Sequence, residues 1–117
     1  MGYYTDFNLE IRTPMTKERA KQITIRLNEL VGWGAFELDI SGFTFMDEKR
    51  EFWKIDVFDE KWYDWEENMT AFVKEFPDVQ FYLEGNGENK DDWWVALFKG
   101  DKKQVKYCSP PIDEWED

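Results

Sequence analysis

The sequence predicts an α+β domain in which two helices cover one face of an antiparallel sheet. Two segments place apolar residues at the helical period, and the segments around them alternate apolar and polar residues as strands do. The chain has 117 residues, of which 42% are hydrophobic, so it is large and apolar enough to build one core. We therefore predict one α+β domain over residues 1–109, followed by an acidic tail over residues 110–117.

The first segment predicts a strand followed by a helix. Apolar and polar side chains alternate over residues 7–11, as in a strand with one buried face. The helix begins at Thr13-Pro14 or at Thr16, because proline is tolerated in a first turn, and Gly32 is a natural C-terminal stop. Its lysines and arginines are interpreted as a solvated surface. The buried stripe of this helix is predicted to be Ala20, Ile23, Leu27, Leu30 and Val31.

A β-hairpin is predicted next. Apolar residues alternate with acidic ones over residues 36–40, and Gly42 marks a bulge or bend before residues 43–45 continue the strand. The polar residues 46–50 are expected to form the hairpin loop. Residues 53–57 alternate again, which predicts the second strand of the hairpin.

The middle of the chain predicts a helix that leads directly into a strand. Asp64 suits the N-cap, and Glu67 three residues later completes a capping-box pattern. Pro77 cannot continue the helical hydrogen bonds, so the helix is expected to end before it. Residues 79–84 then alternate as in a strand, and Gly85-Asn86-Gly87 is predicted to turn the chain. The apolar stripe of this helix is Trp65, Met69, Phe72, Val73 and Phe76.

The remaining residues predict a second hairpin. Residues 93–98 are apolar on both faces, as in a strand that is covered on both sides or that forms a contact. Gly100-Asp101 suits a two-residue turn of type II′, and residues 105–108 form a short last strand.

The predicted order is β-α-β-β-α-β, followed by the C-terminal hairpin as an extension. A split βαβ arrangement, which resembles ferredoxin-like folds, satisfies this order with right-handed crossovers. That arrangement leaves both helices on one face of the antiparallel sheet and the other face open. An α+β meander with a different strand order is the alternative.

The charge of the chain favours a basic partner. The net charge is −11, and residues 32–117 carry twenty-two acidic against ten basic residues, whereas residues 1–31 carry four against five. Such a field repels nucleic-acid phosphates and attracts basic surfaces, although a local basic patch on the first helix stays open. The one cysteine, Cys108, permits no internal disulfide, and no apolar run approaches membrane length. We therefore predict a cytoplasmic protein that binds neither nucleic acid nor membrane directly.

Few residues suit catalysis. The chain has no histidine, which excludes histidine-based triads and zinc–histidine sites, and it has no P-loop. Cys108 is interpreted as a half-buried thiol. Carboxylates are abundant, but their spacing does not match a calcium loop, so we predict no catalytic residue, cofactor or metal site. A metal-dependent carboxylate enzyme is an alternative that would use Glu84, Glu88, Asp91 and Asp92 or Asp56, Asp59, Glu60 and Asp64.

The aromatic side chains predict an interaction surface. The seven tryptophans, together with two of the tyrosines, exceed what two helix stripes and one sheet face can bury. Trp93 and Trp94 cannot both face the helices, because neighbouring strand residues point to opposite sides. One of them, with Tyr82 and Phe98 or with the opposite set, is expected on the open face, unless the hairpin or the tail covers it. The predicted partner-binding residues are Glu84, Glu88, Asp91, Asp92, Trp94 and Tyr82.

Four short motifs carry a resemblance to proteins of mobile elements. They are WYDWEENM and a following phenylalanine from Trp62, FPDV from Phe76, LEGNGE from Leu83, and an aspartate and tryptophan at Asp92 and Trp94. In residues 62–100 the chain is similar to small acidic proteins of bacteriophages, prophages and other bacterial mobile elements. The resemblance transfers no active-site residue. It implies a phage-related context, in which such proteins often inhibit host defence complexes, as anti-CRISPR proteins and DNA mimics do.

The leading hypothesis is a non-enzymatic protein that binds and inhibits a nucleic-acid-handling complex of the host. An acidic surface would present carboxylates where the partner expects phosphates, and exposed aromatic rings would supply apolar contacts. A structural homodimer that closes two open sheet faces together is the main alternative.

Overall fold

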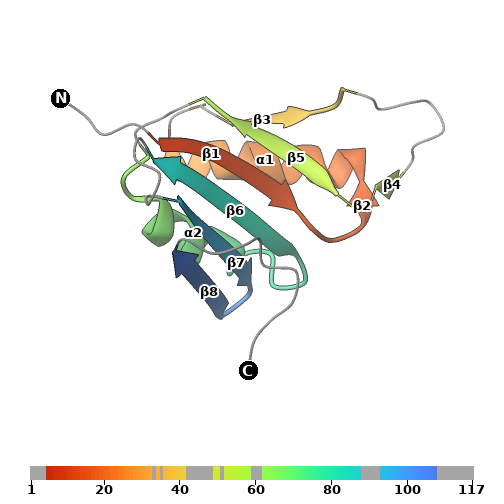
Figure 1. The fold of residues 1–117 in the computed structure, drawn as a ribbon. Helices are drawn as coiled ribbons and strands as arrows, with labels where there is room; N and C mark the ends of the chain where they lie inside the picture. The colour runs from red at the N-terminus through yellow and green to blue at the C-terminus, as the bar shows by residue number, and fades with distance from the viewer. Residues whose placement is uncertain are drawn as a thin grey trace.

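The computed structural model describes residues 5–32, 34, 36–41, 49–50, 52–58, 62–87 and 93–107. These residues form eight strands and two helices (Figure 1). The strands are β1 (Thr5–Ile11), β2 (Met15–Thr16), β3 (Phe36–Asp39), β4 (Lys49–Arg50), β5 (Trp53–Val57), β6 (Gln80–Gly87), β7 (Trp93–Lys99) and β8 (Lys102–Tyr107), and the helices are α1 (Lys17–Val31) and α2 (Trp65–Val73).

Six of the strands form one antiparallel sheet in the order β3-β5-β1-β6-β7-β8. Both helices lie on the same side of this sheet, α1 behind β1 and β5 and α2 behind β6 and β7 (Figure 1). The α+β class, the antiparallel sheet and the two helices are therefore confirmed. The strand order differs from that of a four-stranded split βαβ sheet, because β7 and β8 extend the sheet beyond β6.

The core lies between the sheet and the helices. Each strand of the main sheet contributes the apolar residues that point toward the helices, and each helix contributes one stripe, as periods of 2.0 and 3.6 residues require. Burying these side chains is the main stabilising contribution to the domain. The largest fully buried side chains are Trp53, Trp62, Phe72, Phe81, Phe98, Leu9, Ile11, Ile23, Leu27, Ile55, Met69 and Leu83.

Local signals explain the limits of α1. The Thr16 hydroxyl accepts a hydrogen bond from the backbone N–H of Arg19 at 3.3 Å, so the helix begins at the later of the two predicted positions. Gly32 has φ 82°, and its N–H donates to the Asn28 carbonyl at 2.8 Å. The Asn28 side chain also bonds both backbone groups of Phe36, at 2.8 and 3.0 Å, which ties β3 to the end of α1.

Helix α2 is shorter than its apolar stripe predicts. Asp64 is the N-cap as predicted, but its side chain makes no capping hydrogen bond. The helix ends at Val73, and Glu75 and Phe76 form turns through backbone bonds to Phe72 and Val73. Phe76 nevertheless packs against the core, because it lies one turn beyond Phe72 and their rings are 5.3 Å apart. The prediction of a helix reaching Phe76 is therefore wrong by three residues.

The predicted glycine turn is also wrong. Gly85, Asn86 and Gly87 continue β6, where Phe7 of β1 and Trp94 of β7 flank Gly85 on its two sides. A Cβ at position 85 would lie 2.3 Å from two carbons of the Trp94 indole, which is far inside contact distance. Glycine is required here because a tryptophan packs directly over the strand.

Two other predicted segments differ in detail. Residues 49 and 50, predicted in the hairpin loop, pair with Met15 and Thr16 as a second, two-stranded sheet. The second hairpin turns at Gly100-Asp101 as predicted, with φ 57° at Gly100, and its last strand begins earlier, at Lys102. Residues 42–48, Cys108 and the tail lie outside the described residues. Within the described part of the chain, neither helix has the length and apolar character needed to cross a membrane.

Candidate protein-interaction surface

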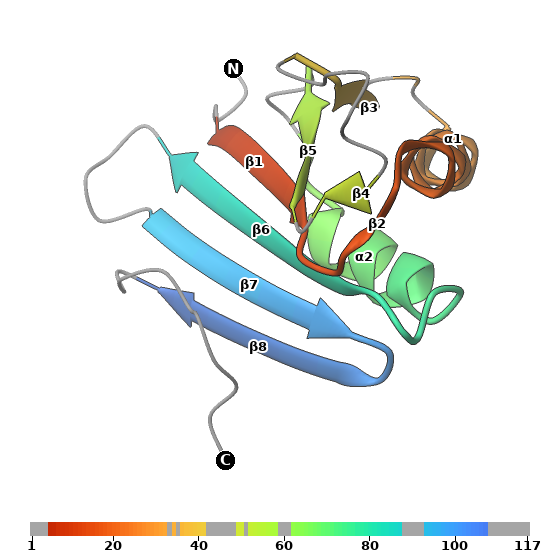
Figure 2. The same cartoon turned by 90° about the vertical axis from the view of Figure 1, so that its right-hand side faces the viewer.

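One face of the main sheet carries the acidic side chains of four neighbouring strands. In Figure 2, α2 lies behind the sheet, and no described helix lies in front of it. The alternation that buries Leu9, Trp53 and Ile55 against the helices directs the intervening residues to this face. We call the part formed by β3, β5, β1 and β6 the acidic face. Its charged residues are Glu37, Asp39, Lys54, Asp56, Asp6, Glu10, Arg12 and Glu84.

Three carboxylates of the acidic face lie in one row across the strands. Glu37 is directly opposite Asp56, Asp56 is opposite Asn8, and Asn8 is opposite Glu84. Directly opposed residues share a face with their side chains close together, and like charges in that position destabilise a sheet. The Glu37–Asp56 pair is therefore unfavourable for folding by itself.

A second row lies beside the first and is closer to neutral. It runs through Asp39, Lys54, Glu10 and Tyr82. The guanidinium of Arg12 binds Glu10, with 3.0 Å between Nε and Oε2, and lies 3.7 Å from the centre of the Tyr82 ring. The acidic face as a whole has six carboxylates and two cations, so it retains a strong negative field.

The Glu84 carboxylate is held in place by a neighbouring ring. The indole N–H of Trp93 donates to Glu84 Oε2 at 3.2 Å, across the β6–β7 pair. Trp93 is half-buried and lies on the face away from the helices, together with Tyr82, Val95 and Leu97. Trp93 therefore orients a carboxylate at the border between an acidic and an apolar region.

Exposed aromatic side chains flank β5 at both ends. Phe52 is 57% exposed and Phe58 is 66% exposed. Phe52 lines a shallow pocket of about 340 Å³ with Glu10, Arg12 and Gln80, which places it at one end of the acidic face. Exposed aromatic rings beside charged residues are typical of protein interfaces.

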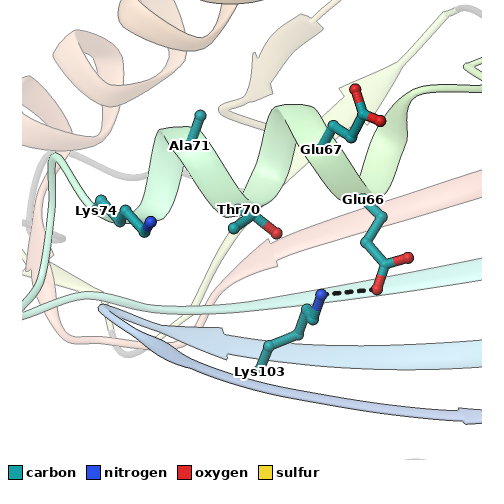
Figure 3. A pocket seen from close by; sticks show the side chains of 6 residues that line it. All are labelled: Glu66, Glu67, Thr70, Ala71, Lys74 and Lys103. Carbon is teal, nitrogen blue, oxygen red and sulfur yellow. Dashed lines mark ion pairs between the residues drawn. The ribbon is translucent and has the colours of Figure 1, made fainter.

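A second hollow lies on the other side of the molecule, between α2 and β8. Figure 3 shows Glu66, Thr70 and Lys74 along α2, with Lys103 of β8 reaching toward them. Lys103 and Glu66 form an ion pair of 2.9 Å between side chains that are 39% and 47% exposed. A pair this exposed contributes about 1 kcal/mol at most. This hollow, which Glu67 and Ala71 also line, brings together opposite charges that hold β8 to α2.

The predicted partner-binding residues have different fates. Glu84 lies on the acidic face, while Glu88, Asp91 and Asp92 lie outside the described residues. Tyr82 is on the expected face but is only 5% exposed. The prediction that its ring is exposed is therefore wrong, because Arg12 and the apolar residues of β7 pack around it.

Trp94 lies on the face of the sheet that packs against the helices, whereas a contact with a partner would need it on the other face. It is 8% exposed, and its ring stacks on Trp65 of α2 with centroids 3.9 Å apart. Phe98 also faces the helices, so the prediction that it shares a face with Tyr82 is wrong, and Trp93 is the tryptophan on the Tyr82 side. A Trp94→Ala change would open a cavity under α2 and would not report on contacts made by the other face.

The basic residues of α1 are engaged more than a solvated helix surface predicts. Arg19 binds both carboxylate oxygens of Asp78, at 3.0 and 2.8 Å, and Arg26 binds both of Glu75, at 2.6 and 3.0 Å. These hydrogen bonds hold the pKa of the Asp78 and Glu75 carboxyls below their ordinary values. Two of the four predicted surface cations are therefore paired with the turns after α2, which reduces any basic patch on α1.

Sequence reasoning missed Glu37 and Phe52, and it considered Asp56 only for the alternative metal-dependent enzyme. A signal was available, because the acidic residues of the predicted strands all fall on the polar side of the alternation. In the described residues, no group of three or more acidic or cysteine side chains is arranged to hold a metal ion. No family model matches the chain, and no curated protein or solved structure shows a significant match to it.

Proposed function

We propose that this protein is a non-enzymatic binding module whose acidic face binds a basic surface of another protein. The carboxylate row of Glu37, Asp56 and Glu84 carries this proposal. The row includes an unfavourable pair of directly opposed acids, which the fold alone does not need. A binding role explains why that pair is present.

The geometry of the row suits a partner that ordinarily binds nucleic acid. Neighbouring strands are about 4.8 Å apart, so Glu37 and Asp56 are adjacent and Glu84 lies about 10 Å beyond Asp56. A basic surface built for phosphates would find a line of negative charges there. We propose that the protein acts as a DNA mimic on a host nucleic-acid-handling complex, in the bacterial cytoplasm. The resemblance of residues 62–100 to mobile-element proteins supports this context.

We also propose that β1-α1-β3-β5-α2-β6 is a ferredoxin-like unit. The neighbours of β1 are β5 and β6, and β3 lies outside β5, which supports this assignment. In such a unit the helices occupy one face, and the acidic face is the opposite one.

The test is capture of a partner from nuclease-treated bacterial lysate, with and without competitor DNA. A triple variant, Glu37→Lys, Asp56→Lys and Glu84→Lys, should lose the partner, and competitor DNA should displace the partner from the wild-type protein. The control is Glu18→Lys, Glu29→Lys and Glu67→Lys, which changes the net charge equally through exposed residues of the helices. If both triple variants lose the partner equally, net charge alone explains the binding. If the acidic-face variant still captures the partner, the proposal is contradicted.

A further inference from the structure

The pocket beside Phe52 offers a more specific feature than the charge of the acidic face. Its lining combines a carboxylate from Glu10, the guanidinium of Arg12, an amide from Gln80 and the mostly exposed ring of Phe52. Resting on the proposed function, we propose that this pocket receives an arginine side chain of the basic partner. The partner would therefore be distinguished by arginine, beyond its positive charge.

The ring of Phe52 is the reason to choose arginine over lysine. A guanidinium is planar and weakly hydrated, so it stacks on an aromatic ring at a smaller desolvation cost than an ammonium. Phe52 is 57% exposed and lies at the wall of the pocket, so it offers such a surface to an incoming side chain. An arginine already lies over an aromatic ring beside the pocket, because the guanidinium of Arg12 is 3.7 Å from the centre of the Tyr82 ring.

The charge of the pocket permits a second guanidinium. The Arg12 side chain is 15% exposed and is held by Glu10 Oε2 at 3.0 Å, so its positive charge is largely balanced within the sheet. A carboxylate has two oxygens and can accept from two guanidinium groups. Glu10 can therefore serve Arg12 and a partner arginine, and the neighbouring carboxylates of the acidic face favour the additional cation.

The test uses two peptides of equal length and charge, GRGRGRGRG and GKGKGKGKG, each labelled and followed by fluorescence anisotropy. Wild-type protein should bind the arginine peptide about threefold or more tightly than the lysine peptide. Phe52→Ala should remove this preference by weakening arginine-peptide binding, while lysine-peptide binding stays the same. Phe52→Tyr should retain the preference, and Phe58→Ala, which removes another mostly exposed ring that does not line the pocket, should leave it unchanged.

The outcomes separate this proposal from the proposed function. If both peptides bind equally and Phe52→Ala has no effect, the arginine pocket is refuted while the acidic face stands. If neither peptide binds at 50 mM salt, both proposals fail. The arginine-pocket proposal would also be refuted if a glutamate peptide of the same design bound through Arg12, because the pocket would then select anions. Thermal melts of the variants, whose changed rings are mostly exposed, verify that each remains folded.

Discussion

Replacing Glu37 by lysine should make the protein more stable and a weaker binder. Glu37 lies directly opposite Asp56 on the same face of the sheet, and Glu37 is exposed. Like charges in this position destabilise, whereas an opposite-charge pair stabilises by about 0.2–1 kcal/mol. Reversing one charge should therefore raise the free energy of unfolding by about 1 kcal/mol. For a domain of this size, that change corresponds to a rise in Tm of about 4 °C.

Urea denaturation, followed by tryptophan fluorescence at pH 7, measures this change. The gain should shrink between 50 mM and 1 M salt, because exposed charges are screened. Glu37→Gln should give a smaller gain, since it removes the repulsion without adding attraction. Glu29→Lys on α1 controls for net charge. If Glu37→Lys lowers the free energy of unfolding, or if its effect is the same at 50 mM and 1 M salt, repulsion between Glu37 and Asp56 does not destabilise the sheet. The pair then gives no support to the proposed binding role.

Three further predictions concern the fold. Gly85→Ala should lower the free energy of unfolding by about 1–3 kcal/mol, because its Cβ would overlap the Trp94 indole. Reduced Tm would show this, and an unchanged Tm would mean that the indole moves freely. Trp94→Ala should cost about 3–5 kcal/mol in urea denaturation by emptying the space beside Trp65, and a loss below 1 kcal/mol would contradict its place in the core. Acidification should weaken the ion pair of Arg19 with Asp78, whose pKa is lower in the folded protein than in the unfolded chain. Its contribution is present above about pH 4 and is lost as pH falls through the folded pKa. Urea midpoints from pH 6 to pH 3 should therefore fall less steeply in Arg19→Met, and identical slopes would refute the linkage.

The sequence predicted the elements well where the signal is local. Helix α1, between its caps Thr16 and Gly32, follows from an apolar stripe and a glycine stop, both of which act within a few residues. The strand at 53–57 follows from alternation in the same way. The prediction of a glycine turn at 85–87 is wrong because Gly85 makes room for the Trp94 ring of the neighbouring strand, and glycine suits both a turn and such a close approach.

The candidate site was predictable only in part. Alternation assigned Glu84 and Tyr82 to one side of their strand correctly, but it could not show that Tyr82 is covered. The choice between Trp93 and Trp94 depended on which face of β7 meets α2, and the apolar pattern of β7 is the same on both faces. The pairing of Arg19 and Arg26 with the turns after α2 joins residues almost fifty or more positions apart, which no local pattern reveals.

The sequence by itself determined the fold class, the sidedness of each strand and the negative charge of the chain. These properties follow from residue type and spacing, because side-chain direction repeats along a strand or helix. Only the tertiary structure decided that Glu37, Asp56 and Glu84 share one row, since strand order and register bring together residues from three separate strands. Register is set by packing of the buried face, and it positions the polar side chains of the opposite face as a consequence.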